Sequence, residues 1–205
     1  TDQIFAMAGR VTKRDEKTAA AIFESLLLTG IAMSFTKTSR PGSGTEHIMA
    51  HFWECMELLD SKTPNYHGED VGVTTLIMLR YYEALARLPQ VTAHPEICNW
   101  DEIYSIYGPL APDVQKLNTP DTITDGIAPR WIEACWPQIR RIVQSVPSYD
   151  ACLAAMRQAG CKTTIEEVGK APDFVDISFR FHPYMRRRLS LKRVSHMLDL
   201  PEDLF

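Results

Sequence analysis

The chain has 205 residues, of which 45% are hydrophobic and 23% charged. This composition indicates one globular domain, or two small ones, and excludes a disordered or fibrous protein. The formal net charge of −4 argues against a nucleic-acid-binding surface. Five cysteines occur without a C-x-x-C pair, which favours reduced thiols and a cytoplasmic protein. Polar residues interrupt the apolar run at 19–35, so we expect no membrane span.

Apolar residues recur at helical spacing along most of the chain. The segments with this pattern are residues 3–13, 15–37, 43–60, 67–88, 99–107, 111–118, 128–146, 148–159 and 189–200. Only residues 177–181 resemble a strand, and they lie beside helical sequence. We therefore predict an all-α, multi-helix, bundle-like domain of roughly eight to ten helices.

The sequence offers no usual binding site for a nucleotide. No G-x-G-x-x-G motif follows a strand, and the β-α-β alternation that accompanies such a motif is missing. The sequence also begins at Thr1, without a methionine. We expect residues 1–205 to form one helical domain, the C-terminal part of a longer polypeptide.

Three of the six histidines lie close together in the sequence, within residues 39–72. His47 and His51 are four residues apart, so on a helix both imidazoles project from one face. Ser43 and Glu46 have the spacing of a capping box, which predicts that this helix begins just after the glycine-rich turn. His67 opens the next helical segment, from which its side chain can point back toward the first helix.

This arrangement predicts a site for a divalent metal ion. His47 and His67 can supply two ligands, while His51 can supply a third or stand beside the ion and transfer protons. Carboxylates that can serve as an oxygen ligand or a hydrogen-bond acceptor are those of Glu46, Glu54 and Glu69. Zinc, iron and nickel all accept imidazole ligands, so the residues leave the identity of the metal open.

Two motifs connect these residues to a known family. The string S-R-P-G-S-G-T-E-H-x-x-x-H-x-W-E covers residues 39–54, and H-G-E-x-V-G-V covers residues 67–73. Together they resemble the sn-glycerol-1-phosphate dehydrogenases, which belong to the superfamily of dehydroquinate synthases, glycerol dehydrogenases and iron-containing alcohol dehydrogenases. The resemblance is best over about residues 19–80.

The resemblance implies the two-domain organisation of that superfamily. Its members have an N-terminal Rossmann-like domain for NAD or NADP and a C-terminal helical domain that holds the metal, and this chain resembles the second domain only. One aspartate and two histidines bind the metal in the family. The histidines correspond to His47 and His67, and His51 corresponds to a residue implicated in substrate contact or proton transfer. The aspartate has no counterpart here, so the isolated chain is expected to be inactive.

The function implied by the resemblance is hydride transfer between glycerol 1-phosphate and NAD or NADP, which yields dihydroxyacetone phosphate and belongs to phospholipid metabolism. Zinc, or alternatively iron or nickel, would act as the Lewis acid. Arg40 is our candidate for binding the substrate phosphate. The expected partners are the polyol phosphate, the chain's own nucleotide-binding domain and a second copy in a homo-oligomer. The alternatives are a glycerol dehydrogenase, a dehydroquinate synthase-like enzyme, or a non-catalytic helical module that retains the motif.

Overall fold

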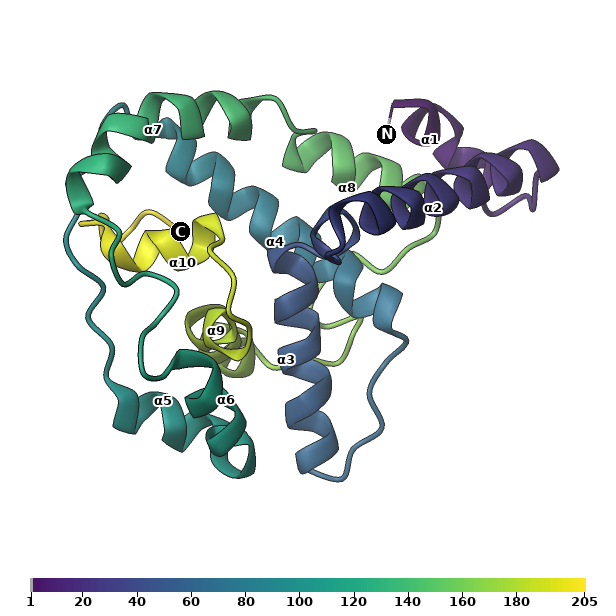
Figure 1. Ribbon diagram of the computed structural model, residues 1–205. Helices are drawn as coiled ribbons and strands as arrows, with labels where there is room; N and C mark the ends of the chain where they lie inside the picture. The colour runs from purple at the N-terminus through teal and green to yellow at the C-terminus, as the bar shows by residue number, and fades with distance from the viewer. Residues whose placement is uncertain (1) are drawn as a thin grey trace.

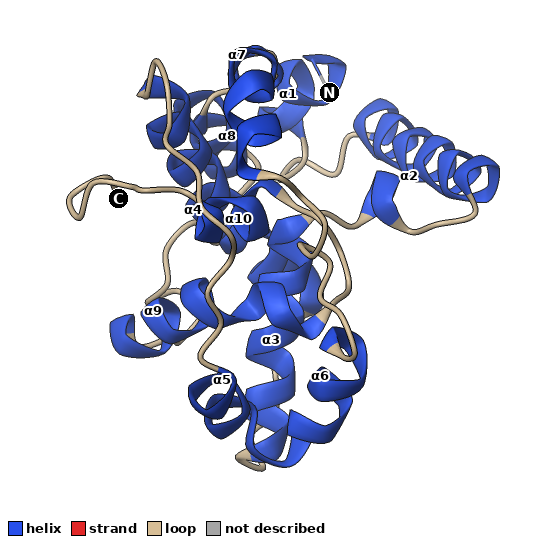
Figure 2. Ribbon diagram, turned by 60° about the vertical axis from the view of Figure 1, so that its left-hand side comes forward, coloured by secondary structure: helices blue, strands red, loops and turns tan. Residues whose placement is uncertain are grey.

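The computed structural model describes residues 2–205, and within them it contains ten α-helices and five short 3-10 turns but no strand (Figures 1 and 2). The prediction of an all-α domain is therefore confirmed. The helices are α1 (Asp2–Met7), α2 (Glu16–Thr36), α3 (Thr45–Leu59), α4 (His67–Arg87), α5 (Trp100–Tyr107), α6 (Ala111–Asn118), α7 (Pro129–Gln144), α8 (Tyr149–Gln158), α9 (Pro172–Phe181) and α10 (Leu191–Val194).

Helix α3 and the first half of α4 form the centre of the larger of two hydrophobic clusters. Apolar residues of α3 at positions 48, 49, 52 and 53 follow the helical period and are buried, so one face of the helix is wholly apolar. Phe52 packs edge-on against Tyr107 of α5. Trp53 donates its indole N–H to Ser178 Oγ of α9 at 2.7 Å, which satisfies the one polar atom of a fully buried ring.

The second cluster lies along the C-terminal half of α4. Its buried members are Tyr81, Leu85, Ile132, Trp136, Met197 and Leu198. They bring α7 and the end of the chain together around α4, as Figure 1 shows. The Trp136 indole donates to the carbonyl of Leu88 at 2.9 Å, just beyond the last residue of α4. Helix α4 therefore contributes residues to both hydrophobic clusters and connects them.

A buried group of charges joins α3 and α4 to the segment before α9. The Lys170 ammonium lies 2.5 Å from Glu57 Oε1 and 3.4 Å from Asp70 Oδ2. The side chains of Lys170 and Asp70 are 1% and 0% exposed, and Asn65 donates to the other oxygen of Asp70. Burial raises the pKa of the Asp70 carboxyl, although Asn65 and Lys170 oppose this effect. Lys170 therefore supplies the positive charge that balances the carboxylates of both Glu57 and Asp70.

Helix α2 extends away from the rest of the molecule (Figure 2). Its exposed large apolar residues are Phe23, Leu26, Leu27, Leu28, Ile31 and Phe35. By length and composition alone, Glu16–Thr36 could cross a membrane, and only 11% of its apolar window is buried. Signal sequences and core helices of soluble proteins pass the same test, and a single such helix is weak evidence for a span. The polar interruptions alone therefore do not exclude a span, and the expectation that this run does not cross a membrane stays a prediction.

Two local predictions near the C-terminus differ from the structure. The strand-like run at 177–181 is the last part of α9, which begins with Pro172 at its first position and buries Ser178 and Phe181. The helix expected over 189–200 ends at Val194 and continues only as a 3-10 turn to Met197. The backbone there turns to residues 92–94 instead, since the His94 N–H donates to the Met197 carbonyl at 2.8 Å.

Candidate metal centre

The site begins where a glycine-rich turn enters α3. The N-cap of α3 is Gly44, and its N–H donates to Glu46 Oε1 at 2.9 Å. A Cβ on Gly44 would lie 2.5 Å from Glu46 Oε2, so the glycine is needed for the carboxylate to fold back over the helix start. The capping box predicted for Ser43 and Glu46 is therefore shifted by one residue, and only the glutamate half of it forms.

The structure brings the three histidines of the motif together. His47 and His51 lie one turn apart on α3, and His67 is the first residue of α4. The ring centroids of His47 and His67 are 5.3 Å apart with their planes tilted by 57°. Those of His51 and His67 are 4.7 Å apart and nearly parallel, at 17°. The side chains of the three are 24%, 35% and 44% exposed in chain order, so the cluster opens to solvent.

Each imidazole is bonded through Nδ1 to a carboxylate. Glu54 lies 2.5 Å from His67 Nδ1 through Oε1 and 3.1 Å from His51 Nδ1 through Oε2. Glu46 Oε1 lies 2.8 Å from His47 Nδ1. Burial raises the pKa of the Glu54 carboxyl, but the hydrogen bonds from His67 and His51 outweigh it and hold that pKa below its ordinary value. Ionised carboxylates only accept hydrogen bonds, so the histidines donate through Nδ1, and an imidazole that binds a metal in this orientation does so through Nε2.

The donor set fits a divalent ion of the zinc, iron or nickel type. Ligand atoms of His51, Glu54 and His67 lie within 4.8 Å of one another, and His47 is the next imidazole beside His67. Neutral imidazoles whose Nδ1 is held by a carboxylate are the usual form of histidine in metal sites. Glu69, the third candidate carboxylate, is instead paired with Lys162 at 2.8 Å.

Arg40 lies on the 3-10 turn Arg40–Gly42, just before the entry to α3, and is exposed. Sequence reasoning missed a second arginine beside it. Arg188 reaches this turn from the end of the chain and donates to the Ser43 carbonyl and to Ser39 Oγ, both at 2.6 Å. No local pattern marks this contact, because the partners are 145 and 149 residues apart in the sequence.

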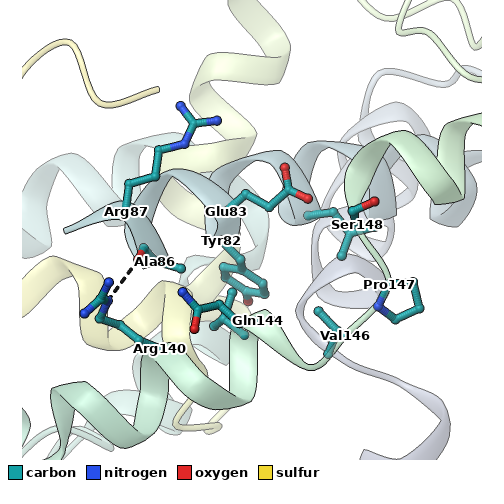
Figure 3. Close-up of a pocket in the computed structure, with 11 residues that line it drawn as sticks. Tyr82, Glu83, Ala86, Arg87, Arg140, Gln144, Val146, Pro147 and Ser148 are labelled. Atoms are coloured by element: carbon teal, nitrogen blue, oxygen red, sulfur yellow. Dashed lines mark hydrogen bonds between the residues drawn. The ribbon is translucent and has the colours of Figure 1, made fainter. Parts of the chain in front are cut away.

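A separate cleft of about 350 Å³ lies between α4 and the connection from α7 to α8 (Figure 3). Its residues on α4 run from Leu79 to Arg87, and Arg140 closes one end by donating to the Ala86 carbonyl. Leu79 is twelve residues beyond His67, or roughly 18 Å along the helix. This cleft is therefore distinct from the histidine cluster.

Replacement of Glu54 by glutamine tests the role of the shared carboxylate. An amide offers one acceptor oxygen instead of two, so one of the imidazoles bonded to residue 54 loses its orientation. We expect the zinc affinity of the chain to fall about 10–100-fold, as is typical when such a partner is removed. Competition with a chromophoric chelator measures the change. The matched control is Glu69→Gln, which removes the same charge from an ion pair with Lys162; equal affinities of the two variants would contradict the prediction.

Comparison with known proteins finds relatives that are named glycerol-1-phosphate dehydrogenase. The chain is 26% identical over 190 residues to a protein of Geobacillus stearothermophilus named glycerol-1-phosphate dehydrogenase (NAD(P)+), covering 93% of this chain and 40% of the relative. A protein of the same name from Thermoplasma volcanium is 25% identical over 162 residues, covering 77% and 40%. The protein of that name from Thermococcus kodakarensis is 39% identical over 64 residues, covering 31% and 17%.

No protein-family model matches the chain, and no solved structure matches it. The chain spans about 40% of the length of the first two relatives described. Similarity over 93% of the chain together with this shorter span is consistent with a C-terminal domain of such proteins. We conclude that the chain is a homologue of the glycerol-1-phosphate dehydrogenases.

Proposed function

We propose that the chain is the metal- and substrate-binding part of an NAD(P)-dependent sn-glycerol-1-phosphate dehydrogenase. The observation that carries this proposal is the meeting of His47 and His67, which come from two helices and lie with ring centroids 5.3 Å apart. The relatives carry the name of that enzyme, and the motifs that resemble the family are the ones that form the cluster.

The geometry of the rings favours His47 and His67 as the metal ligands. The lone pair of an imidazole nitrogen lies in the plane of the ring, so two rings bind one ion only where their planes meet. The planes of His47 and His67 are tilted by 57° and cross. Those of His51 and His67 are nearly parallel and stacked, so in this arrangement their in-plane lone pairs run side by side instead of converging. We therefore assign His51 to the substrate side of the centre.

The residues of this chain then have separate tasks. His51 donates through Nδ1 to Glu54, which leaves its Nε2 free to accept the proton of a substrate hydroxyl. Glu54 holds His51 and His67 in one arrangement because it bonds to both. When bound, the divalent ion supplies Lewis-acid polarisation of the substrate oxygen, and NAD(P) supplies the hydride acceptor. Arg40, at the edge of the cluster, is proposed to bind the substrate phosphate.

The exposed apolar face of α2 supports a larger polypeptide. Monomeric proteins seldom leave such a face open to water, and this chain spans only part of its relatives' length. We propose that this face packs against the part of the polypeptide that binds the nucleotide, and that the missing aspartate ligand comes from there. The cytoplasmic location and the homo-oligomer remain predictions of the same hypothesis.

The test is an assay of the complete polypeptide encoded by the gene, loaded with zinc, iron or nickel. We expect NAD(P)-dependent oxidation of glycerol 1-phosphate, with glycerol 3-phosphate and glycerol as poor substrates. Turnover of glycerol alone would favour a glycerol dehydrogenase instead. No turnover of glycerol 1-phosphate with either nucleotide and any of the three metals would overturn the proposed function.

A further inference from the structure

Arg188 is anchored to the turn that leads into α3. It donates from Nη1 to the Ser43 carbonyl and from Nη2 to Ser39 Oγ, each at 2.6 Å. A guanidinium has five N–H donors in a planar fork. Among residues 3–205, these two bonds are the only ones that the Arg188 side chain makes, so three donors stay open beside the turn. The side chain is therefore fixed in place while three of its five N–H donors remain available for a ligand.

Two further arginines lie close enough to this guanidinium for their charges to act on it. Arg40 follows Ser39 directly, and Arg186 is two residues before Arg188, whose N–H donates to the Arg186 carbonyl. Burial lowers the pKa of Arg188, and the positive charges of Arg186 and Arg40 lower it further. In the described part of the chain, none of the three has a carboxylate within ion-pair distance. Their neighbour Arg187, in contrast, pairs with Asp121 at 2.6 Å.

Three unpaired like charges held together raise the free energy of the site unless an anion joins them. The charge of the Glu46 carboxylate acts on Arg188, but one of its oxygens, Oε1, already accepts from the Gly44 N–H and contacts His47 Nδ1, and it is one negative charge beside three positive ones. The segment around the turn therefore keeps an excess of positive charge. Planar guanidinium forks match the paired oxygens of phosphate groups better than any other side chain.

We propose that Arg188, together with Arg40 and Arg186, forms the binding site for a phosphate monoester next to the histidine cluster. The identity of that ester as the substrate rests on the proposed function, whereas the anion site rests on these contacts alone. Ser43, whose carbonyl Arg188 contacts, is two residues before the start of α3 and four before His47. The proposed site therefore places the phosphate of a small ester on the arginines at the entry to α3 and a hydroxyl of the ester at the imidazoles in the first turns of that helix.

Calorimetric titration of the metal-free chain with inorganic phosphate, and then with glycerol 1-phosphate, tests the site. We expect Arg188→Gln and Arg188→Lys each to weaken phosphate binding roughly tenfold or more, since charge-assisted bidentate contacts are lost. Arg40→Gln and Arg186→Gln should weaken it as well. These two variants are informative even if Arg188→Gln fails to fold, because in the described chain their side chains form no hydrogen bond that the fold depends on.

Arg187→Gln is the matched control. It removes the same charge from the same run, but from a side chain paired with Asp121, and phosphate affinity should stay within about twofold of the wild type. Equal loss in Arg187→Gln and Arg188→Gln would show unspecific attraction and overturn the site, as would unchanged affinity in Arg40→Gln and Arg186→Gln. No phosphate binding by the wild-type chain would overturn it too. If the series holds but the complete polypeptide does not oxidise glycerol 1-phosphate, the proposed function fails and the anion site stands.

Discussion

His67→Ala is expected to lower the zinc affinity of the chain by more than about 100-fold. That loss exceeds the roughly 10–100-fold that is typical when a residue that only hydrogen-bonds to a metal ligand is removed. His67 is the imidazole that both other rings approach, at centroid distances of 5.3 and 4.7 Å. Its loss leaves His47 as the one imidazole of the proposed ligand pair, and a single ligand does not hold a divalent ion tightly. His47→Ala should have an effect of the same size, because its ring plane crosses that of His67.

His51→Ala separates the two possible ligand sets in the same titration. If the parallel ring of His51 is not a ligand, this variant keeps zinc affinity within about tenfold of the wild type. His94→Ala is the control, since that ring bonds to the Pro95 carbonyl far from the cluster in sequence. A loss in His51→Ala as large as that in His67→Ala would refute the assignment of His47 and His67. It would favour the set of His51, Glu54 and His67 instead.

Lys170→Met should destabilise the fold by about 3–5 kcal/mol at neutral pH, because it leaves buried charges without a partner. The ammonium is the cation that both Glu57 and Asp70 contact, and Asp70 is completely buried. Such a loss is a large share of the roughly 5–15 kcal/mol that holds a typical domain together. Urea unfolding, followed by circular dichroism, gives the difference in the free energy of unfolding.

The effect of Lys170→Met should shrink as the pH falls. Burial already raises the pKa of Asp70 with the lysine present, and removal of the lysine raises it further. A carboxyl with a raised pKa in the folded state destabilises that state above this pKa and is harmless once protonated. Lys116→Met is the control, because its pair with Asp113 is exposed and should cost less than about 1 kcal/mol. A loss that is equal at neutral and acidic pH would contradict this explanation.

Most of the helices could be predicted because their pattern is local. The ranges expected for α2, α4, α5, α6 and α8 differ from the structure by at most one residue at either end, and that for α6 is the same. The cluster of His47, His51 and His67 also follows from local rules, since two of them share a helix face and the third opens the next helix. Their roles as ligands and proton acceptor stay predictions that the metal titrations test.

What the sequence could not show depends on contacts between distant segments. Glu54 was one of three candidate carboxylates, and only the packing of α3 against α4 distinguishes it from Glu69, which is paired with Lys162. The helix expected near the C-terminus is cut short because residues 197–199 bond to residues 92–94. Arg188 belongs to a basic run that is typical of a solvated surface, and its contact with Ser43 has no local signature.

The anchoring of Arg188 also has a consequence for biosynthesis. Ser39 and Ser43 leave the ribosome before the side chain that fixes them, which follows 145 or more residues later. At ordinary translation rates that delay is on the order of ten seconds. During this interval α3 and α4 can already pair, while the turn before α3 lacks its guanidinium. The nascent protein thus acquires its imidazoles first and completes the neighbouring basic site only after Arg188 has been added.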